Sequence, residues 1–160
     1  KIPSLNELLS SFKDLRFNID VKADEALEGT VQIVKDHKAL NRVCFASFSS
    51  KRLDRIRSLA GPNCCTSMGT REILQARIGS FGIPLNLSSG YCAQVPLSQW
   101  GLPLVTVNFI NYLKKKGKLI HVWTIDEDQE MKRLISMGVN GIMTDKPKVL
   151  KRVLIESELM

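Results

Sequence analysis

Short apolar segments alternate with longer amphipathic segments along this chain, and this alternation constrains the fold more than any other feature. The alternation is clearest near the C-terminus, where strands are predicted at Leu119–Thr124 and Val139–Thr144. Asp126 is the expected cap of the helix between them, and Gly138 is the expected stop after Met137. Strands that alternate with helices are typical of βαβ units, so the sequence predicts an α/β fold with a parallel sheet.

Three further strands and four further helices are predicted nearer the N-terminus. The strands are expected at Arg16–Lys22, Val43–Ser47 and Cys64–Met68. The helices are expected from Ser4 to Phe12, from Asp24 to His37, from Ser49 or Ser50 to Gly61, and from Thr70 onward; later helices end at Lys116 and start at Pro147. Residues 79–103 are rich in glycine and proline, so we expect an irregular segment there. The prediction is therefore five strands.

The segment Arg16–Lys22 has two unlike faces. Its alternating residues are apolar at Phe17, Ile19 and Val21 and polar at Asn18, Asp20 and Lys22. Successive side chains of a strand point to opposite faces. A buried parallel strand is normally apolar on both faces, so the polar face here indicates a site.

Charge and hydropathy exclude several classes of protein. The net charge is +7 over 160 residues, but the basic residues are spread along the chain. The densest run, residues 114–118, falls where a helix should end and where cations complement the helix dipole. We therefore expect no nucleic-acid partner. No apolar run of about 18 residues is present, so we expect no membrane-spanning segment.

The four cysteines, Cys44, Cys64, Cys65 and Cys92, form no CxxC pair, and the chain has only two histidines. A zinc site is therefore not expected. Apolar neighbours favour buried thiols in a reducing compartment, which predicts a cytoplasmic location. The chain opens at Lys1 rather than Met, so we expect that an N-terminal segment is missing.

Six motifs together resemble the glycerophosphodiester phosphodiesterase family. In chain order they are IPSLNELL, RFNIDVK, FASFSSKRLDRIR, the Ala93–Pro96 segment, HVWTID and MGVNGIMTDKP, and they extend over nearly the whole chain. The resemblance implies a partial (β/α)₈ TIM barrel in which the five strands are the fourth to eighth. Residues 1–160 would then be the C-terminal portion of the barrel domain. The family's His-Arg pair and Glu-x-Asp segment, which would precede it, are absent here.

The resemblance also implies roles for the polar face of Arg16–Lys22. Asp20 would ligate a divalent cation, Mg²⁺ or Ca²⁺, and Lys22 would bind the phosphate of the substrate. Many family members carry Glu where this chain has Asp20. The two residues share one face of the strand at a spacing of about 7 Å, which suits this chemistry. A salt bridge between neighbours is the other interpretation.

Two further substrate-binding residues are implied by the resemblance. Trp123 would line the pocket beside the glycerol, and Gln94, in the expected loop, would contact the substrate near the pocket mouth. Trp123 could equally fill the barrel core. Phe48 and Phe109 could form apolar pocket walls or pack in the core. For two other residues the structural interpretation is the default: His121 as a core histidine rather than a ligand, and Asp145 as a helix cap.

The resemblance implies a phosphoric diester hydrolase that cleaves glycerophosphodiesters to glycerol 3-phosphate and an alcohol, in lipid and glycerol metabolism. No catalytic residue is assigned within this chain, and we expect the isolated chain to be inactive. The alternative is a non-catalytic binding or interaction module made from barrel units. Open sheet edges also make self-association possible.

Overall fold

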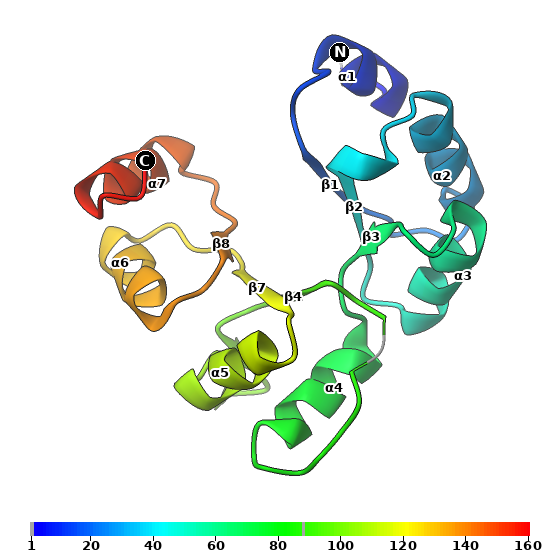
Figure 1. The fold of residues 1–160 in the computed structure, drawn as a ribbon. Helices are drawn as coiled ribbons and strands as arrows, with labels where there is room; N and C mark the ends of the chain where they lie inside the picture. Colours follow the sequence, from blue (N-terminus) through cyan, green and yellow to red (C-terminus); the bar gives the residue numbers. More distant parts are fainter. Residues whose placement is uncertain (1, 88) are drawn as a thin grey trace. The chain divides into compact units, whose positions relative to one another are not determined.

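Two three-stranded parallel sheets carry the fold, as the computed structural model shows (Figure 1). The structure describes residues 2–87 and 89–160; Lys1, at which the sequence opens, and Ser88, within the expected irregular segment, lie outside the described residues. The chain divides into unit 1, Lys1–Ile73 with Ser88–Tyr91, and unit 2, Leu74–Leu87 with Cys92–Met160. Each unit contains one of the two sheets.

Unit 1 contains the sheet with strand order β1-β2-β3. Its elements are α1 (Leu5–Ser11), β1 (Phe17–Asp20), α2 (Leu27–Asp36), the 3-10 helix η1 (Leu40–Arg42), β2 (Val43–Ala46), α3 (Ser50–Ala60) and β3 (Cys65–Thr66), followed by the start of α4 (Thr70–Gly79). Strands alternate with helices and all pair in parallel, which is the predicted βα repetition.

Local capping sets the helix starts in unit 1. The Ser4 hydroxyl accepts from the Glu7 amide at 3.2 Å, and the Glu7 carboxylate accepts from the Ser4 amide at 2.7 Å. This reciprocal arrangement is the capping box that starts α1. The Ser49 hydroxyl accepts from the Arg52 amide and starts α3. Both starts confirm the sequence prediction.

One face of the β1-β2-β3 sheet is covered by α2 and α3 (Figure 1). Phe17 pairs in register with Val43, and Ile19 with Phe45, so these side chains share the covered face. The core of unit 1 consists of Leu9, Val21, Leu27, Val31, Val34, Ala39, Val43, Phe45, Leu53 and Ile56. The opposite face carries the polar residues of β1, as the alternation predicted.

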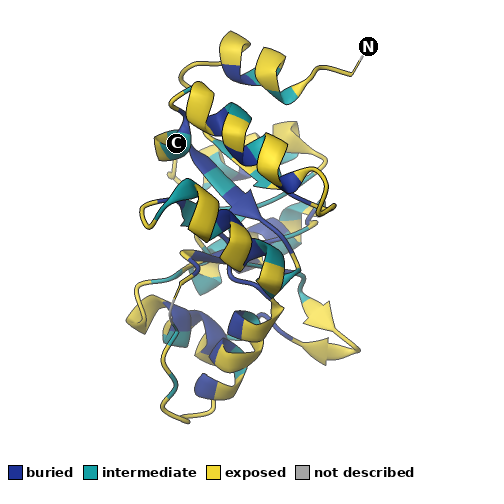
Figure 2. Ribbon diagram, turned by 90° about the vertical axis from the view of Figure 1, so that its right-hand side faces the viewer, coloured by how far each residue is buried: buried dark blue, intermediate teal, exposed yellow. Residues whose placement is uncertain are grey.

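Unit 2 contains the sheet with strand order β4-β7-β8. Its elements are the rest of α4, β4 (Cys92–Val95), the antiparallel pair β5 (Ser98–Gln99) and β6 (Leu102–Pro103), α5 (Val107–Lys115), β7 (Leu119–Val122), α6 (Asp128–Met137), β8 (Gly141–Ile142) and α7 (Pro147–Glu156). Figure 2 shows the outer faces of the helices exposed, whereas the parallel strands are mostly buried or half-buried and the β5–β6 pair is exposed. Gly138 ends α6 at φ +84°, a left-handed conformation that favours glycine.

The two faces of the unit 2 sheet differ in burial. Ala93, Ile120 and Val122 are completely buried, and they alternate with half-buried residues at Gln94 and His121. Because successive side chains alternate between faces, one face carries the apolar core and the other is partly open.

The strand β4 was missed by the sequence prediction, which placed Gln94 in a loop. Gln94 lies on β4 and pairs in register with His121 of β7. The described residues therefore contain six parallel strands, so the predicted count of five was wrong. A partial barrel remains a prediction.

Two predicted helix caps were also wrong, because each predicted residue lies one position before the observed cap. The cap of α6 is Glu127 rather than Asp126, and the cap of α7 is Lys146 rather than Asp145. The Asp126 carboxylate instead accepts from the Thr144 hydroxyl at 2.8 Å, which joins the ends of β7 and β8.

Other details differ in degree. Leu59 of α3 is exposed, although Leu53 and Ile56 of the same helix are buried. Cys64 and Cys92 are buried as predicted, whereas Cys44 and Cys65 are only half-buried. Lys114 and Lys115 lie in the last turn of α5, which confirms the interpretation of the basic run as a helix end. Among the described residues, no helix has the length and apolar character needed to cross a bilayer.

Candidate functional site

The predicted pair Asp20 and Lys22 meets at the carboxyl end of β1. Asp20 is the last residue of the strand, and its Oδ2 lies 3.9 Å from Nζ of Lys22. The side chains are 37% and 82% exposed, respectively. The two residues therefore form a solvent-facing ion pair, an arrangement that contributes little to stability. A charged pair of this kind remains accessible to a ligand.

The backbone between Asp20 and Lys22 is fixed by two residues of the next βα unit. The Val21 carbonyl accepts from the Ser47 hydroxyl at 2.9 Å and from an Arg52 guanidinium nitrogen at 3.0 Å. Arg52 also donates to the Asp24 carboxylate at 2.7 Å, beyond Lys22. Ser47 and Arg52 thus hold the turn that presents the ion pair. Both belong to the motif FASFSSKRLDRIR, but the sequence did not reveal their role.

Phe48 and Phe109, considered as pocket walls, have different environments. Phe48 follows β2 and is 67% exposed, at the same end of the sheet as Asp20. Phe109 is fully buried in unit 2. The core interpretation is confirmed for Phe109 and is wrong for Phe48.

In unit 2, a row of side chains crosses the partly open face of the sheet. Gln94 of β4 lies in register with His121 of β7, which lies in register with Gly141 of β8. A Cβ at Gly141 would come within 2.7 Å of the His121 ring, so the ring packs directly over the glycine. Trp123 follows β7 and is half-buried, and its amide donates to the Val95 carbonyl at 3.1 Å.

His121 is a packed histidine. Burial lowers the pKa of its ring because the charged form is poorly solvated there. The ring is therefore neutral at pH 7. The packing of the ring over Gly141 agrees with the prediction of a core histidine.

The described residues do not by themselves fit a complete Mg²⁺ or Ca²⁺ site. Such cations take about six oxygen ligands, and Asp20 offers one carboxylate. Within residues 2–87 and 89–160, no group of three or more His, Cys, Asp or Glu side chains is placed to hold a metal ion.

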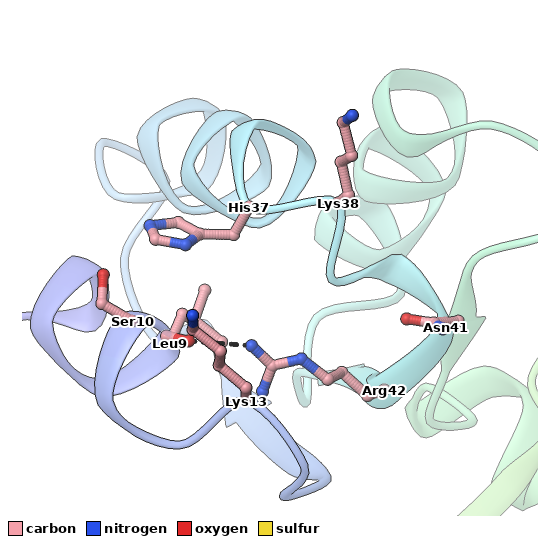
Figure 3. A pocket seen from close by; sticks show the side chains of 7 residues that line it. All are labelled: Leu9, Ser10, Lys13, His37, Lys38, Asn41 and Arg42. Carbon is pink, nitrogen blue, oxygen red and sulfur yellow. Dashed lines mark hydrogen bonds between the residues drawn. The ribbon is translucent and has the colours of Figure 1, made fainter.

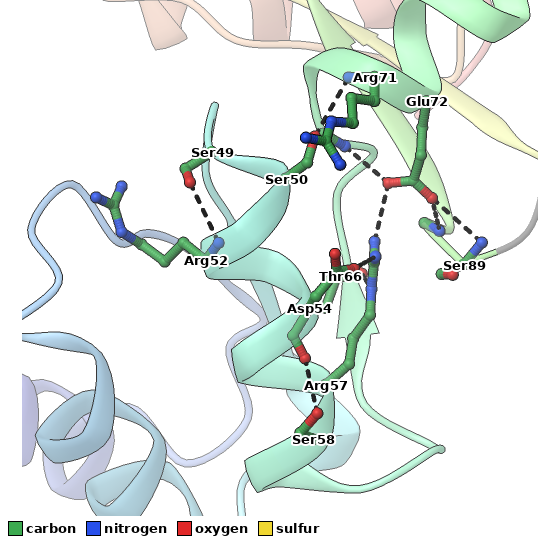
Figure 4. A network of polar contacts seen from close by, with 12 residues as sticks. Ser49, Ser50, Arg52, Asp54, Arg57, Ser58, Thr66, Arg71, Glu72 and Ser89 are labelled. Carbon is green, nitrogen blue, oxygen red and sulfur yellow. Dashed lines mark hydrogen bonds and ion pairs between the residues drawn. The ribbon is translucent and has the colours of Figure 1, made fainter.

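A polar network in unit 1 escaped the sequence prediction (Figure 4). Arg57 of α3 donates to the Thr66 hydroxyl at 3.0 Å, to the Ser67 carbonyl at 3.2 Å and to the Glu72 carboxylate at 3.0 Å. Glu72 also accepts from the backbone amides of Gly69, Ser89 and Gly90. The network joins α3, the end of β3 and the start of α4.

The Glu72 carboxylate is ionised within this network. Burial alone would raise its pKa, but hydrogen bonds from the Gly69 and Gly90 amides and the Arg57 guanidinium together outweigh burial and lower the pKa. A buried carboxylate with every lone pair used has a structural role. We assign this network to the stability of unit 1.

A hollow of about 580 Å³ lies elsewhere in unit 1, between α1 and the end of α2 (Figure 3). It is lined by Leu9, Ser10, Lys13, His37, Lys38, Asn41 and Arg42. The Arg42 guanidinium already donates to the carbonyl of Leu9 in α1 and to those of Phe12 and Leu15, which follow α1. None of the predicted site residues lines this hollow, so it is a junction between helices rather than the candidate site.

These features define a class of protein: an α/β chain of parallel βα units with polar side chains at the carboxyl ends of its strands, where such folds bind ligands. The sequence profile described as the glycerophosphoryl diester phosphodiesterase family matches residues 5–149. The chain belongs to this family.

Curated relatives agree with the profile. A Mycobacterium tuberculosis protein named probable glycerophosphodiester phosphodiesterase 2 is 36% identical over 159 residues, covering 96% of this chain and 60% of the relative. A glycerophosphodiester phosphodiesterase of Caldanaerobacter subterraneus is 27% identical, covering 94% of this chain and 60% of the relative. The chain thus spans about 60% of the length of these relatives.

Solved structures show the same fold. A glycerophosphodiester phosphodiesterase from Parabacteroides distasonis superimposes with a TM-score of 0.71 at 20% identity, covering 98% of this chain and 65% of that one. A phosphodiesterase of Oleispira antarctica, solved in complex with the product sn-glycerol-3-phosphate, gives 0.72 at 17% identity, covering 96% and 62%.

Proposed function

We propose that this chain is the C-terminal portion of a phosphodiesterase barrel that cleaves glycerophosphodiesters to glycerol 3-phosphate and an alcohol. The observation that carries the proposal is the solvent-facing Asp20–Lys22 pair at the carboxyl end of β1, in a chain of this family. The names of the relatives and the product bound to the Oleispira antarctica enzyme support the substrate class.

Lys22 binds the phosphate of the substrate in this proposal. Its side chain is 82% exposed and its ammonium group lies 3.9 Å from the Asp20 carboxylate, so an anion can reach it without the side chain leaving a buried site. Ser47 and Arg52 keep the turn in place by holding the Val21 carbonyl. A preorganised cation of this kind stabilises the negative charge of a phosphodiester.

Asp20 contributes one oxygen ligand to a divalent cation, Mg²⁺ or Ca²⁺. When bound, such a cation would neutralise phosphate charge. A single carboxylate does not make a complete cation site. We therefore propose that the remaining ligands are supplied by residues other than those that the structure describes. The isolated 160-residue chain should therefore show negligible turnover of glycerophosphocholine with either cation.

In this proposal Trp123 and Gln94 also contact the substrate, as the family resemblance implies. The half-buried Trp123 offers an apolar ring surface, which suits the carbon skeleton of glycerol. Gln94 lies on β4, and its amide donates to Cys92 Sγ at a weak 3.5 Å. Because Gln94 lies on a strand rather than in the expected loop, the pairing of β4 fixes the direction of its side chain.

The test uses a hybrid in which the N-terminal part of the Mycobacterium tuberculosis relative precedes this chain. Asp20→Asn and Lys22→Met should each lower kcat/KM for glycerophosphocholine on the order of 100-fold, as expected for the loss of one charged group at a reacting phosphate. Glu28→Gln is the matched control, because Glu28 pairs with Arg55 in another exposed ion pair, on the helices.

Retention of full activity by Asp20→Asn and Lys22→Met, in a hybrid that is itself active, would contradict these roles. It would favour the non-catalytic module as the function of this part of the chain. Robust turnover by the isolated 160-residue chain would contradict the proposal that the metal site needs ligands from outside the described residues.

A further inference from the structure

Two cysteines of unit 1 lie side by side on adjacent strands. Cys44 of β2 and Cys65 of β3 are direct partners in the parallel register. Adjacent strands are about 4.8 Å apart, and partners in register point to the same face of a sheet. A disulfide spans Cα separations of about 4.4 to 6.8 Å. The usual spacing of adjacent strands thus falls within the Cα range of a disulfide.

The face on which the pair lies is the polar face of the sheet. Phe45, between Cys44 and Ala46, points into the core covered by α2 and α3, so Cys44 points the other way. Asn18 of β1 completes the row, being in register with Cys44. Cys44 and Cys65 are half-buried, whereas Cys64 and Cys92 are only 4% and 2% exposed. Only the paired cysteines among these four are open to a reagent.

The Cys65 thiol also differs chemically from the buried Cys64 thiol. A hydrogen bond with Cys44 lowers the pKa of the Cys65 thiol to about 7, against the opposing effect of burial. Burial raises the pKa of Cys64. The thiolate is the reacting form of cysteine. Cys65 is therefore able to attack at neutral pH, whereas Cys64, the preceding residue, is not.

We propose that Cys44 and Cys65 form a dithiol site that reacts with a low-molecular-weight disulfide and closes into a disulfide between β2 and β3. This modification is independent of the proposed phosphodiesterase activity, since neither residue belongs to the Asp20–Lys22 pair.

The reaction proceeds by two thiol–disulfide exchanges. The Cys65 thiolate attacks one sulfur of the external disulfide, forms a mixed disulfide and releases one thiolate, which takes up a proton. Cys44 then loses its proton to solvent and attacks the Cys65 sulfur, which breaks the mixed disulfide and releases a second thiol. The external disulfide gains two electrons and two protons, and the protein loses the same.

Oxidised glutathione is the probe, and the 160-residue chain is the sample. Trypsin cuts after Lys and Arg, so Cys44 falls on the peptide of residues 43–51 and Cys65 on that of residues 58–71. We expect mass spectrometry to find these two peptides joined, with fragmentation placing the link at Cys65 rather than Cys64. The Cys64→Ala chain should form the same link, and Cys92 should remain unmodified.

Reactivity of the thiolate gives a second measurement. In Cys44→Ala, the Cys65 thiol loses its hydrogen-bond partner, and its alkylation by iodoacetamide at pH 7 should slow about fivefold, since the smaller thiolate fraction is partly offset by higher intrinsic nucleophilicity. Cys64→Ala should leave this rate unchanged. Because Cys44 is half-buried, its replacement by alanine should leave the circular dichroism of the chain intact.

Three results would overturn the proposal. They are a link between Cys64 and Cys65, glutathione adducts on Cys65 that never resolve to an internal link, and an alkylation rate at Cys65 that Cys44→Ala does not change.

Discussion

The polar faces of the two units are built differently, although both sheets are parallel. In unit 1 the polar face ends in the exposed charges of Asp20 and Lys22, which pack against little. In unit 2 it carries the half-buried Gln94, His121 and Trp123, of which Gln94 and His121 are direct partners on adjacent strands. Substitutions in the first group should therefore affect ligand binding more than stability, and substitutions in the second should affect both.

A similar contrast exists within unit 1, between the exposed Asp20–Lys22 pair and the shielded Arg57–Glu72 pair. The side chains of Arg57 and Glu72 are 18% and 11% exposed. Removal of one partner from a pair shielded in this way leaves the other charge poorly solvated. Loss of one partner should therefore change the stability little at the exposed Asp20–Lys22 pair and greatly at the shielded Arg57–Glu72 pair.

The largest expected effect on stability is that of Arg57→Leu. It should lower the free energy of unfolding by about 3 kcal/mol, because Glu72 would keep its buried charge and lose its cationic partner. Urea unfolding followed by circular dichroism measures the change. Arg55→Leu is the matched control on the same helix, since its partner Glu28 is exposed, and it should change the free energy by less than about 1 kcal/mol. Equal losses in the two variants would remove the contrast.

Trp123→Ala should have an intermediate effect on stability and a clear effect on binding. We expect about 2 kcal/mol less stability, roughly half the cost of removing a fully buried aromatic residue. In the active hybrid, KM for glycerophosphocholine should rise about tenfold from lost apolar contact with the glycerol. Trp123→Phe should recover most of the stability. An unchanged KM in Trp123→Ala would assign this ring to the core alone.

The smallest effect concerns acid stability. The pKa of Glu72 is lowered in the folded chain, so its contribution to stability is fully present above its ordinary value of 4.5 and is lost as the pH falls through the lower folded value. Unfolding midpoints measured below pH 5 should therefore fall more steeply for the parent chain than for Glu72→Gln. Parallel pH profiles would show that Glu72 does not titrate as its contacts require.

Local signals in the sequence predicted much of the fold. The Ser4–Glu7 capping box, the Ser49 cap and the alternation of residues 17–22 are each specified by a few neighbouring residues, and each was confirmed. β4 was missed because its four residues lie within a segment rich in glycine and proline. Asp126 was misassigned because its partner Thr144 lies 18 residues away.

The candidate site shows the same difference between features set by neighbouring residues, which were predicted, and features set by distant residues, which were not. Asp20 and Lys22 were predicted as a pair because they lie two residues apart on the predicted strand Arg16–Lys22. In the structure β1 ends at Asp20 and Lys22 follows it, and the two side chains still lie together. Their roles in metal and phosphate binding stay predictions. Ser47 and Arg52, which hold the turn, act through the carbonyl of Val21 more than 25 residues away in sequence. No periodicity reveals such a contact.

The central claim is that the carboxyl end of β1 is part of a phosphodiester site. A crystal structure of the active hybrid with Mg²⁺ and sn-glycerol 3-phosphate tests it most directly. We expect a further strand on the outer edge of β1, the phosphate against Lys22 Nζ and the cation against Asp20. A bare edge, or one paired with a second copy of this chain, with cation and phosphate bound away from both residues, would contradict the claim.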